Sequence, residues 1–258
     1  MTGTSIDRRE RLPAGNRLLN VGFEVTTPAH GLGLVEVNFA NAYALRERLA
    51  AERGFKLSPV VLLVKAVARA LELEPQAHAF LQGGTLIRPG QVDVGVSVAG
   101  KGNFAPVAVL TDVGAKKADQ LTAELRDLAA KKRAEEDQAL KLFGILYWLL
   151  GFDGLRRAAL AFGLRRFLIA RQLVGTIQVS TLPQFDLFWP LRFSSSAVIA
   201  LGAIKPRPWV ADGQLTIAPV GRITIAIDHR VLDGWKADRF LTEIGRVLSD
   251  PAELASFV

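Results

Sequence analysis

An alternation of isoleucines near the carboxyl end of the chain constrains the fold more than any other feature. Ile223, Ile225 and Ile227 occupy every second position, which is the period of a strand with one buried face. Apolar residues then recur at helical spacing over 235–248. The sequence therefore predicts a strand that passes directly into a helix, with residues 228–234 at the junction.

The rest of the chain alternates between strand-like and helix-like segments. Ser58 followed by Pro59 is typical of a helix start, and the helix that follows is apolar nearly all round until Pro75 ends it. We expect further helices over 42–53 and 118–140, strands over 34–38, 92–98, 106–110, 175–181, 197–204 and 215–217, and a turn over 209–213. This order predicts one α/β domain over 1–258, in which helices cover a mixed sheet and the helix at 59–73 is central and buried.

The residue types that are missing from the chain exclude several kinds of chemistry. Its 258 residues include no cysteine and only three histidines, His30, His78 and His229, which lie far apart in the sequence. Disulfides, a cysteine nucleophile and cysteine-held metals are therefore excluded, and we expect no metal site. The amino-terminal residues are charged and lack the apolar stretch of a secretory signal, so we expect a cytoplasmic protein.

The positive charge of the chain is concentrated in one segment. The formal net charge is +7, yet residues 140–173 alone carry six cations and one acid. The remainder is nearly neutral, with 26 cations against 24 acids. A nucleic-acid-binding domain usually spreads its basic residues over a whole face, so we expect no nucleic-acid partner.

The same segment, 140–173, is also strongly apolar. Residues 142–152 contain no charged side chain, although the run is shorter than the roughly 20 residues that span a bilayer. Two interpretations remain open. The segment is either a pair of interfacial helices on an anionic membrane surface, peripheral to the bilayer, or a helical hairpin packed on the domain or on a partner subunit, which we favour.

The junction after the isoleucine strand carries the pattern His-x-x-x-Asp-Gly. His229 has the side chain whose ordinary pKa lies nearest neutrality, which suits a general base. Asp233 can cap the following helix or hold an arginine, and Gly234 allows a backbone geometry that a Cβ would forbid. The pattern is short and occurs in many chains by chance, so it becomes specific only together with its surroundings.

Those surroundings resemble the catalytic domain of the dihydrolipoyl acyltransferases, which form the cores of 2-oxoacid dehydrogenase complexes. The stretch DHRVLDGWKADRFL is similar to the family's carboxyl-terminal motif, and chloramphenicol acetyltransferase and peptide-synthetase condensation domains share a related one. Residues 55–81, 92–107 and 197–222 also resemble the family. The resemblance implies a chloramphenicol acetyltransferase-like fold, to which residues 140–173 add a basic, hydrophobic helical insertion.

The resemblance also implies a reaction and the residues that perform it. His229 would deprotonate the thiol of coenzyme A or of a lipoyl group, and the thiolate would attack a thioester. Ser180, in GTIQVSTLPQF, would stabilise the oxyanion, with Thr181 as a less favoured neighbour. Asp233 would support the site through an ion pair with an arginine, for which Arg17 is a candidate.

Further expectations concern the substrate and the assembly. Asn103, Phe104, Thr181 and Gly234 are the expected substrate-binding residues, and His30 and His78 are expected to be structural. Coenzyme A would be a substrate, and no lipoyl group would be bound covalently to this chain. The family's active site lies between subunits, so we expect a homotrimer or a larger assembly built from trimers.

Departures from the family leave the substrate open. No lipoyl domain is recognisable, and Leu182-Pro183 stands where the family has Leu-Gly. We therefore expect a stand-alone acyltransferase that uses acyl-CoA or a related thioester. A non-catalytic oligomeric scaffold that binds a membrane or a partner through 140–173 is the alternative, and an antibiotic acetyltransferase ranks lower.

Overall fold

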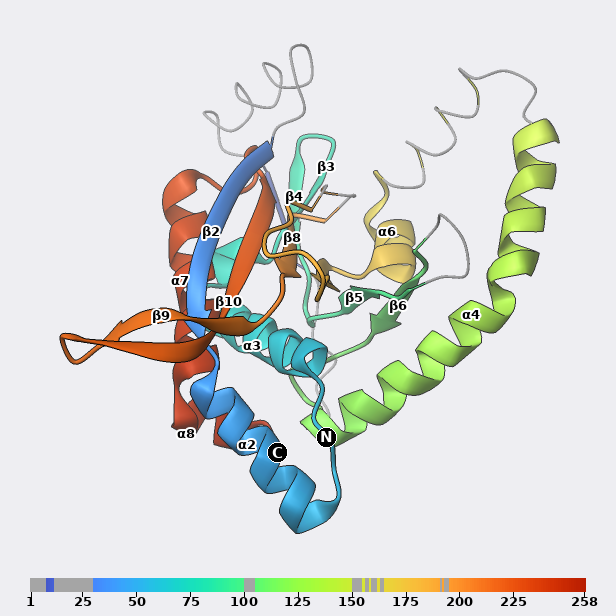
Figure 1. Ribbon diagram of the computed structural model, residues 1–258. Helices are drawn as coiled ribbons and strands as arrows, with labels where there is room; N and C mark the ends of the chain where they lie inside the picture. The colour runs from blue at the N-terminus through green and yellow to red at the C-terminus, as the bar shows by residue number, and fades with distance from the viewer. Residues whose placement is uncertain are drawn as a thin grey trace, which may run out of the picture.

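The structure is a computed structural model that describes residues 8–11, 30–99, 105–149, 155, 158, 162, 165–190, 192 and 195–258. A mixed sheet of seven strands forms its centre (Figure 1). Six strands follow the order β2 (His30–Asn38), β10 (Gln214–Asp228), β8 (Ala197–Leu201), β7 (Ile177–Thr181), β5 (Val94–Ser97) and β6 (Val107–Leu110), and β9 (Lys205–Ala211) pairs with β10. The pairs β5–β7 and β7–β8 are parallel and the others are antiparallel, which confirms the predicted mixed sheet.

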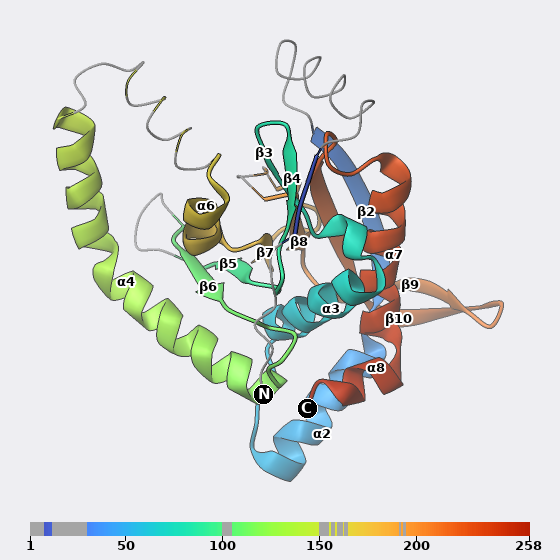
Figure 2. The same ribbon diagram turned by 180° about the vertical axis from the view of Figure 1, so that it is seen from behind.

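A second, smaller sheet has three antiparallel strands. Its order is β1 (Arg8–Arg11), β4 (Thr85–Arg88) and β3 (Phe80–Gln82). The described helices are α2 (Ala40–Arg53), α3 (Pro59–Leu73), α4 (Ala118–Leu149), α6 (Phe167–Val174), α7 (Gly234–Ser249) and α8 (Pro251–Ser256), with a 3-10 turn η1 (Pro75–Ala77). Helices α3 and α7 pack against each other and cover one face of the central sheet (Figure 2).

The central buried helix predicted at 59–73 is α3. The Ser58 hydroxyl accepts a hydrogen bond from the Val60 amide at 3.3 Å, and Pro59 occupies the first turn. All residues from Val61 to Ala68 are buried, so the helix contacts protein on nearly every side. The helix ends at Leu73, immediately before the Glu74–Pro75 pair, because proline disfavours helical geometry at the residue before it.

The hairpin of β9 and β10 differs from the prediction. The turn expected over 209–213 is confined to Asp212 and Gly213, which both have positive φ as a tight hairpin turn requires. Residues 205–211 form a strand despite Pro206 and Pro208, because β9 lies at the edge of the sheet and pairs only with β10. The short strand predicted at 215–217 is the beginning of the 15-residue β10.

Helix α4 is longer than predicted. It was expected to end near residue 140 but continues to Leu149, so the start of the segment 140–173 prolongs an existing helix. The end of the same segment forms α6. Among the helices in the described part of the chain, none has the length and apolarity needed to cross a membrane.

Candidate active site

His229 lies immediately after the last residue of β10. The Val231 and Leu232 amides both donate hydrogen bonds to the Asp228 carbonyl, at 2.8 and 2.9 Å, and so form a tight turn around His229. The half-buried imidazole lies against β2, where a methyl group added to Gly31 would come within 3.3 Å of its Cδ2 atom. The strand end and the turn therefore fix the backbone of His229, and the missing side chain of Gly31 leaves room for its ring.

Asp228 forms a buried cluster of charge beside His229. Its carboxylate, in a residue only 2% exposed, accepts bonds from Arg230 Nε and Nη2 at 2.9 Å and lies 3.1 Å from Arg192 Nη1. Burial lowers the pKa of the Arg192 guanidinium. The negative charge of Asp228 opposes this shift, and the positive charge of Arg230 adds to it. His30 pairs in register with Asp228, and burial, followed by the charge of Arg192, lowers its pKa. The cluster anchors the strand end that carries His229.

Sequence reasoning missed this cluster. Arg230 stands inside the quoted motif but received no role, and no pattern in the sequence pointed to Arg192. His78, in contrast, matches its structural expectation: it is buried, and its Nε2 lies 2.7 Å from the Thr176 hydroxyl.

Asp233 caps helix α7. Its carboxylate accepts bonds from the Lys236 amide at 2.9 Å and from Lys236 Nζ at 2.5 Å. Both bonds hold the pKa of Asp233 below its ordinary value, the side-chain bond more strongly. The expectation of an arginine partner is therefore not met among the described residues, because the N-cap position places the carboxylate over the side chain three residues later. Arg17, the candidate partner, lies outside the described residues.

Gly234 is not required by the backbone. It begins α7 without a positive φ, and a methyl group added to it would meet no atom within 4 Å. The expectation that the backbone there forbids a Cβ is therefore wrong, as judged from a single copy of the chain. The next residue, Trp235, is 70% exposed, so the surface beside the motif is open.

Ser180 belongs to a row of residues that crosses four strands. Ser180 pairs with Ala200, Ala200 with Thr224, and Thr224 with Leu34. Directly paired residues point to the same face of a sheet. The residues next to them along each strand point to the opposite face, where they are buried in the core with α3. On the face that carries Ser180, the Thr224 hydroxyl donates to the Phe188 carbonyl at 2.6 Å. The half-buried Ser180 therefore faces away from α3 and α7.

His229 and Ser180 are far apart within one chain. Ser180 shares its row with Thr224, five positions before His229, and two strand spacings separate β7 from β10. With about 3.3 Å per residue and about 4.8 Å per strand, this gives a separation on the order of 20 Å. The chain does not bring the two side chains together, and Thr181 lies even farther along β7. Asn103 and Phe104 lie outside the described residues.

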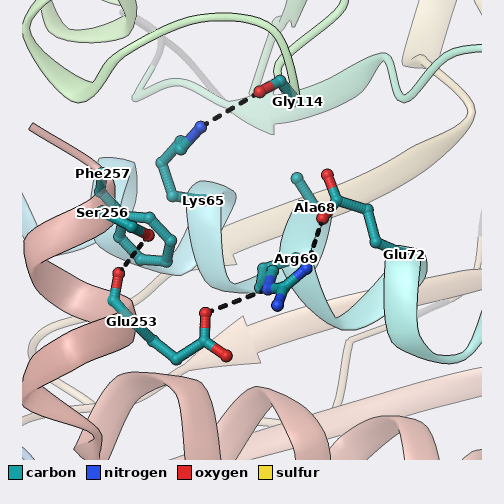
Figure 3. Close-up of a pocket in the computed structure, with 8 residues that line it drawn as sticks. All are labelled: Lys65, Ala68, Arg69, Glu72, Gly114, Glu253, Ser256 and Phe257. Atoms are coloured by element: carbon teal, nitrogen blue, oxygen red, sulfur yellow. Dashed lines mark hydrogen bonds and ion pairs between the residues drawn. The ribbon is translucent and has the colours of Figure 1, made fainter.

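A polar cavity of about 310 Å³ lies elsewhere, between α3, α8 and the loop after β6 (Figure 3). The Lys65 ammonium donates to the carbonyl oxygens of Val113, Gly114 and Lys116, and burial lowers its pKa. Arg69 bonds to carboxylates from α3 and α8. The bonds of Lys65 to backbone carbonyls and of Arg69 to carboxylates join three elements, so we regard the cavity as structural.

The fold is of the chloramphenicol acetyltransferase type. Chloramphenicol acetyltransferase itself superposes with a TM-score of 0.54 at 14% identity, covering 94% of this chain and 100% of the other. The chain belongs to the family described as 2-oxoacid dehydrogenases acyltransferase (catalytic domain), whose model matches residues 23–142 and 186–256. The unmatched interval contains most of the segment 140–173 and also Ser180, so the match does not extend to that serine.

Relatives with known names come from the same family. The chain is 28% identical to the dihydrolipoyllysine-residue acetyltransferase component of the pyruvate dehydrogenase complex from Zymomonas mobilis, over 80% of this chain and 40% of that one. It is 30% identical to the dihydrolipoyllysine-residue succinyltransferase component of the 2-oxoglutarate dehydrogenase complex from Cupriavidus necator, over 85% and 47%. The chain thus spans about half the length of these relatives or less.

Solved structures agree on the fold. The cubic core of a pyruvate dehydrogenase multienzyme complex superposes with a TM-score of 0.69 at 23% identity, covering 93% of this chain and 91% of that one. The dihydrolipoamide acetyltransferase of Azotobacter vinelandii, studied for the catalytic roles of a serine, a histidine and an asparagine, gives the same TM-score at 22% identity, covering the same shares.

Proposed function

We propose that the protein transfers an acyl group between a thioester, acyl-CoA or acyl-lipoyl, and a thiol acceptor, with His229 as the general base. The observation that carries this proposal is the fixed position of His229 at the end of β10, beside open surface and anchored by the Asp228 cluster. The named relatives, which are acetyl- and succinyltransferases, support the reaction class. In the Azotobacter enzyme the asparagine follows the histidine at the interval at which Asp233 follows His229, which supports the residue assignment.

The reaction requires one proton acceptor and one oxyanion donor. The imidazole of His229 takes the proton of the acceptor thiol, and the thiolate sulfur forms a bond to the thioester carbonyl carbon. The carbonyl oxygen becomes an oxyanion, which a hydroxyl donor such as Ser180 stabilises. The intermediate collapses with cleavage of the original carbon–sulfur bond, and the imidazolium returns the proton to the departing thiolate. Coenzyme A is a substrate in this scheme.

We propose that each site is built from two copies of the chain. His229 and Ser180 are too far apart to act together within one chain, as the strand register indicates. The face that carries Ser180 also exposes the apolar side chains of Leu34 and Phe188, at 42% and 36%. A second copy that covers this face with its own strand end would bury those side chains and bring its His229 to Ser180.

A closed ring of three copies forms three such sites, so we propose a homotrimer. The likeness to the cubic core of a pyruvate dehydrogenase complex supports a trimer and allows a larger assembly.

The direct test is acyl transfer by His229→Gln, which keeps the size of the side chain but removes the base. Acyl-CoA donors of increasing chain length are offered to dihydrolipoamide, and transfer is followed by chromatographic separation of free coenzyme A from acyl-CoA, because the total number of free thiols does not change. We expect a loss of about 10²- to 10⁴-fold with His229→Gln. His30→Gln, at the same end of the sheet, is the matched control and should retain transfer. Equal, measurable rates in the His229 variant and the wild type would reject His229 as the base, whereas no transfer by the wild type itself would favour the scaffold alternative.

A further inference from the structure

Helix α6 exposes an apolar face that nothing in the described chain covers. Phe167, Ala170 and Val174 are buried, whereas Leu168 and Leu173 are 62% and 54% exposed. Ile169 adds a further exposed apolar side chain at 38%. The helix is therefore apolar on both sides, and only one side is used by the fold.

The orientation of α6 is fixed by the domain beneath it. Arg171 Nε lies 2.5 Å from Oδ2 of Asp93, which is 2% exposed, and the Phe167 ring lies 5.6 Å from that of Phe80. These contacts hold the buried side of α6 against β3 and β5. A rotation that buried Leu168 and Leu173 would break this ion pair, so the fold of one chain leaves both side chains exposed.

Positive charge lies at the start of this helix. Arg165 and Arg166 are exposed at the start of α6, and the Arg166 guanidinium lies 4.6 Å from the ring centre of Phe162, itself 58% exposed. With Arg171 paired to Asp93, the segment 140–173 still carries five cations and only one acid. An arginine stacked on an exposed aromatic ring, next to exposed leucines, is the side-chain combination of an interfacial membrane helix.

The neighbouring helix leaves the domain on the same side. The carboxyl-terminal half of α4 extends away from the central sheet in both views (Figures 1 and 2). That helix ends at Leu149, and its sequence from 142 to 149 has no charged residue.

We propose that the outward face of α6, with Phe162, Arg165 and Arg166 immediately before it, docks this protein on an anionic lipid bilayer. The occupant is a membrane surface because the face combines exposed aliphatic side chains with an excess of cations. A nucleic acid would match the cations and leave Leu168 and Leu173 exposed to water. Docking of this kind places an acyltransferase domain at the surface where long acyl chains reside, but it does not depend on the proposed reaction.

The test is flotation of the full chain with vesicles of phosphatidylcholine and phosphatidylglycerol, compared with vesicles of phosphatidylcholine alone. We expect binding to the anionic vesicles that weakens as salt is raised. Leu168→Ser with Leu173→Ser, and separately Arg165→Glu with Arg166→Glu, should each weaken partitioning at least about tenfold.

Matched control variants separate a loss of docking from the general effects of removing exposed apolar side chains or of changing the net charge. Leu215→Ser with Ile217→Ser removes two side chains that are 75% and 68% exposed on the β9–β10 hairpin, and should leave flotation unchanged. Arg48→Glu with Lys56→Glu makes the same charge change at exposed positions on and after α2, and should have only a small effect.

Three outcomes would overturn the proposal. Wild-type protein that does not float with anionic vesicles would do so, as would equal binding by the α6 variants and the wild type. A change in molar mass of the Leu168/Leu173 variant in solution, with vesicle binding unchanged, would assign the face to a second copy of the chain. Acyl transfer to soluble dihydrolipoamide, measured in parallel, keeps a failure of docking distinct from a failure of the reaction.

Discussion

Asp228 and Arg192 form a buried ion pair, with Oδ2 and Nη1 3.1 Å apart, at the base of the turn that carries His229. Arg230 binds the same carboxylate from the other direction along the chain. Two guanidinium groups therefore converge on one acid, which stands directly before the proposed catalytic histidine. These bonds anchor the end of β10, so we treat the carboxylate of Asp228 as a positioning group for His229.

Replacement of Asp228 by asparagine should destabilise the protein strongly. The change leaves the buried Arg192 without its carboxylate, and breaking a buried ion pair typically costs about 3–5 kcal/mol. Urea unfolding at fixed protein concentration measures the effect. Glu36→Gln is the control, because Glu36 pairs with Arg222 at 2.9 Å in an exposed position and such pairs contribute about 1 kcal/mol or less. Similar losses in the two variants would contradict the importance of the buried cluster.

The charge of Asp233 should make stability depend on pH in the acid range. The pKa of Asp233 is held below 3.8 in the folded chain, so its contribution is complete above that value and is lost as the pH falls through the lowered pKa. Melting temperatures of wild type and Asp233→Asn should therefore differ at neutral pH and converge in acid. Asparagine preserves the helix cap, which isolates the effect of charge. A difference that stays constant with pH would contradict this account.

Gly234→Ala should separate stability from activity. Alanine at the start of α7 meets no atom within 4 Å, and helix propensity favours it by up to about 1 kcal/mol, so the unfolding free energy should not fall. Slower transfer in a variant of undiminished stability would mean that substrate or a second copy approaches this surface.

Gly95→Ala is the contrasting change. A methyl group there would lie 2.1 Å from the Val174 carbonyl oxygen, where α6 meets β5. We expect a marked loss of stability, as thermal unfolding would show. An unchanged melting temperature would mean that the contact between α6 and β5 is loosely packed.

Local patterns predicted the elements whose signals lie within a few residues. The strand β2, the helices α2, α3 and α7, and the strand that leads to His229 were found because periodicity and capping depend on near neighbours. Strand β9 was missed because Pro206 and Pro208 argue against a strand unless its edge position is known. The extent of α4 was underestimated because the apolar run after residue 140 was assigned to a separate insertion.

The candidate site was predictable only in part. His229, Asp233 and Gly234 share one motif, so the sequence identified them together. The convergence of Arg192 on Asp228 depends on how distant segments pack, and the face of the sheet that Ser180 occupies depends on strand order and register. Neither relationship is encoded in a local pattern, and the separation of Ser180 from His229 follows only from that register.

Co-assembly of two inactive chains tests the central claim most directly. His229→Ala lacks the base and Ser180→Ala lacks the oxyanion donor, so each should be slow when it assembles alone. When the two chains are produced together in equal amounts, random assembly pairs an intact His229 with an intact Ser180 at about one interface in four. We therefore predict recovery of about one quarter of the wild-type transfer rate. A mixed assembly no faster than the two separate variants would contradict a site shared between neighbouring copies.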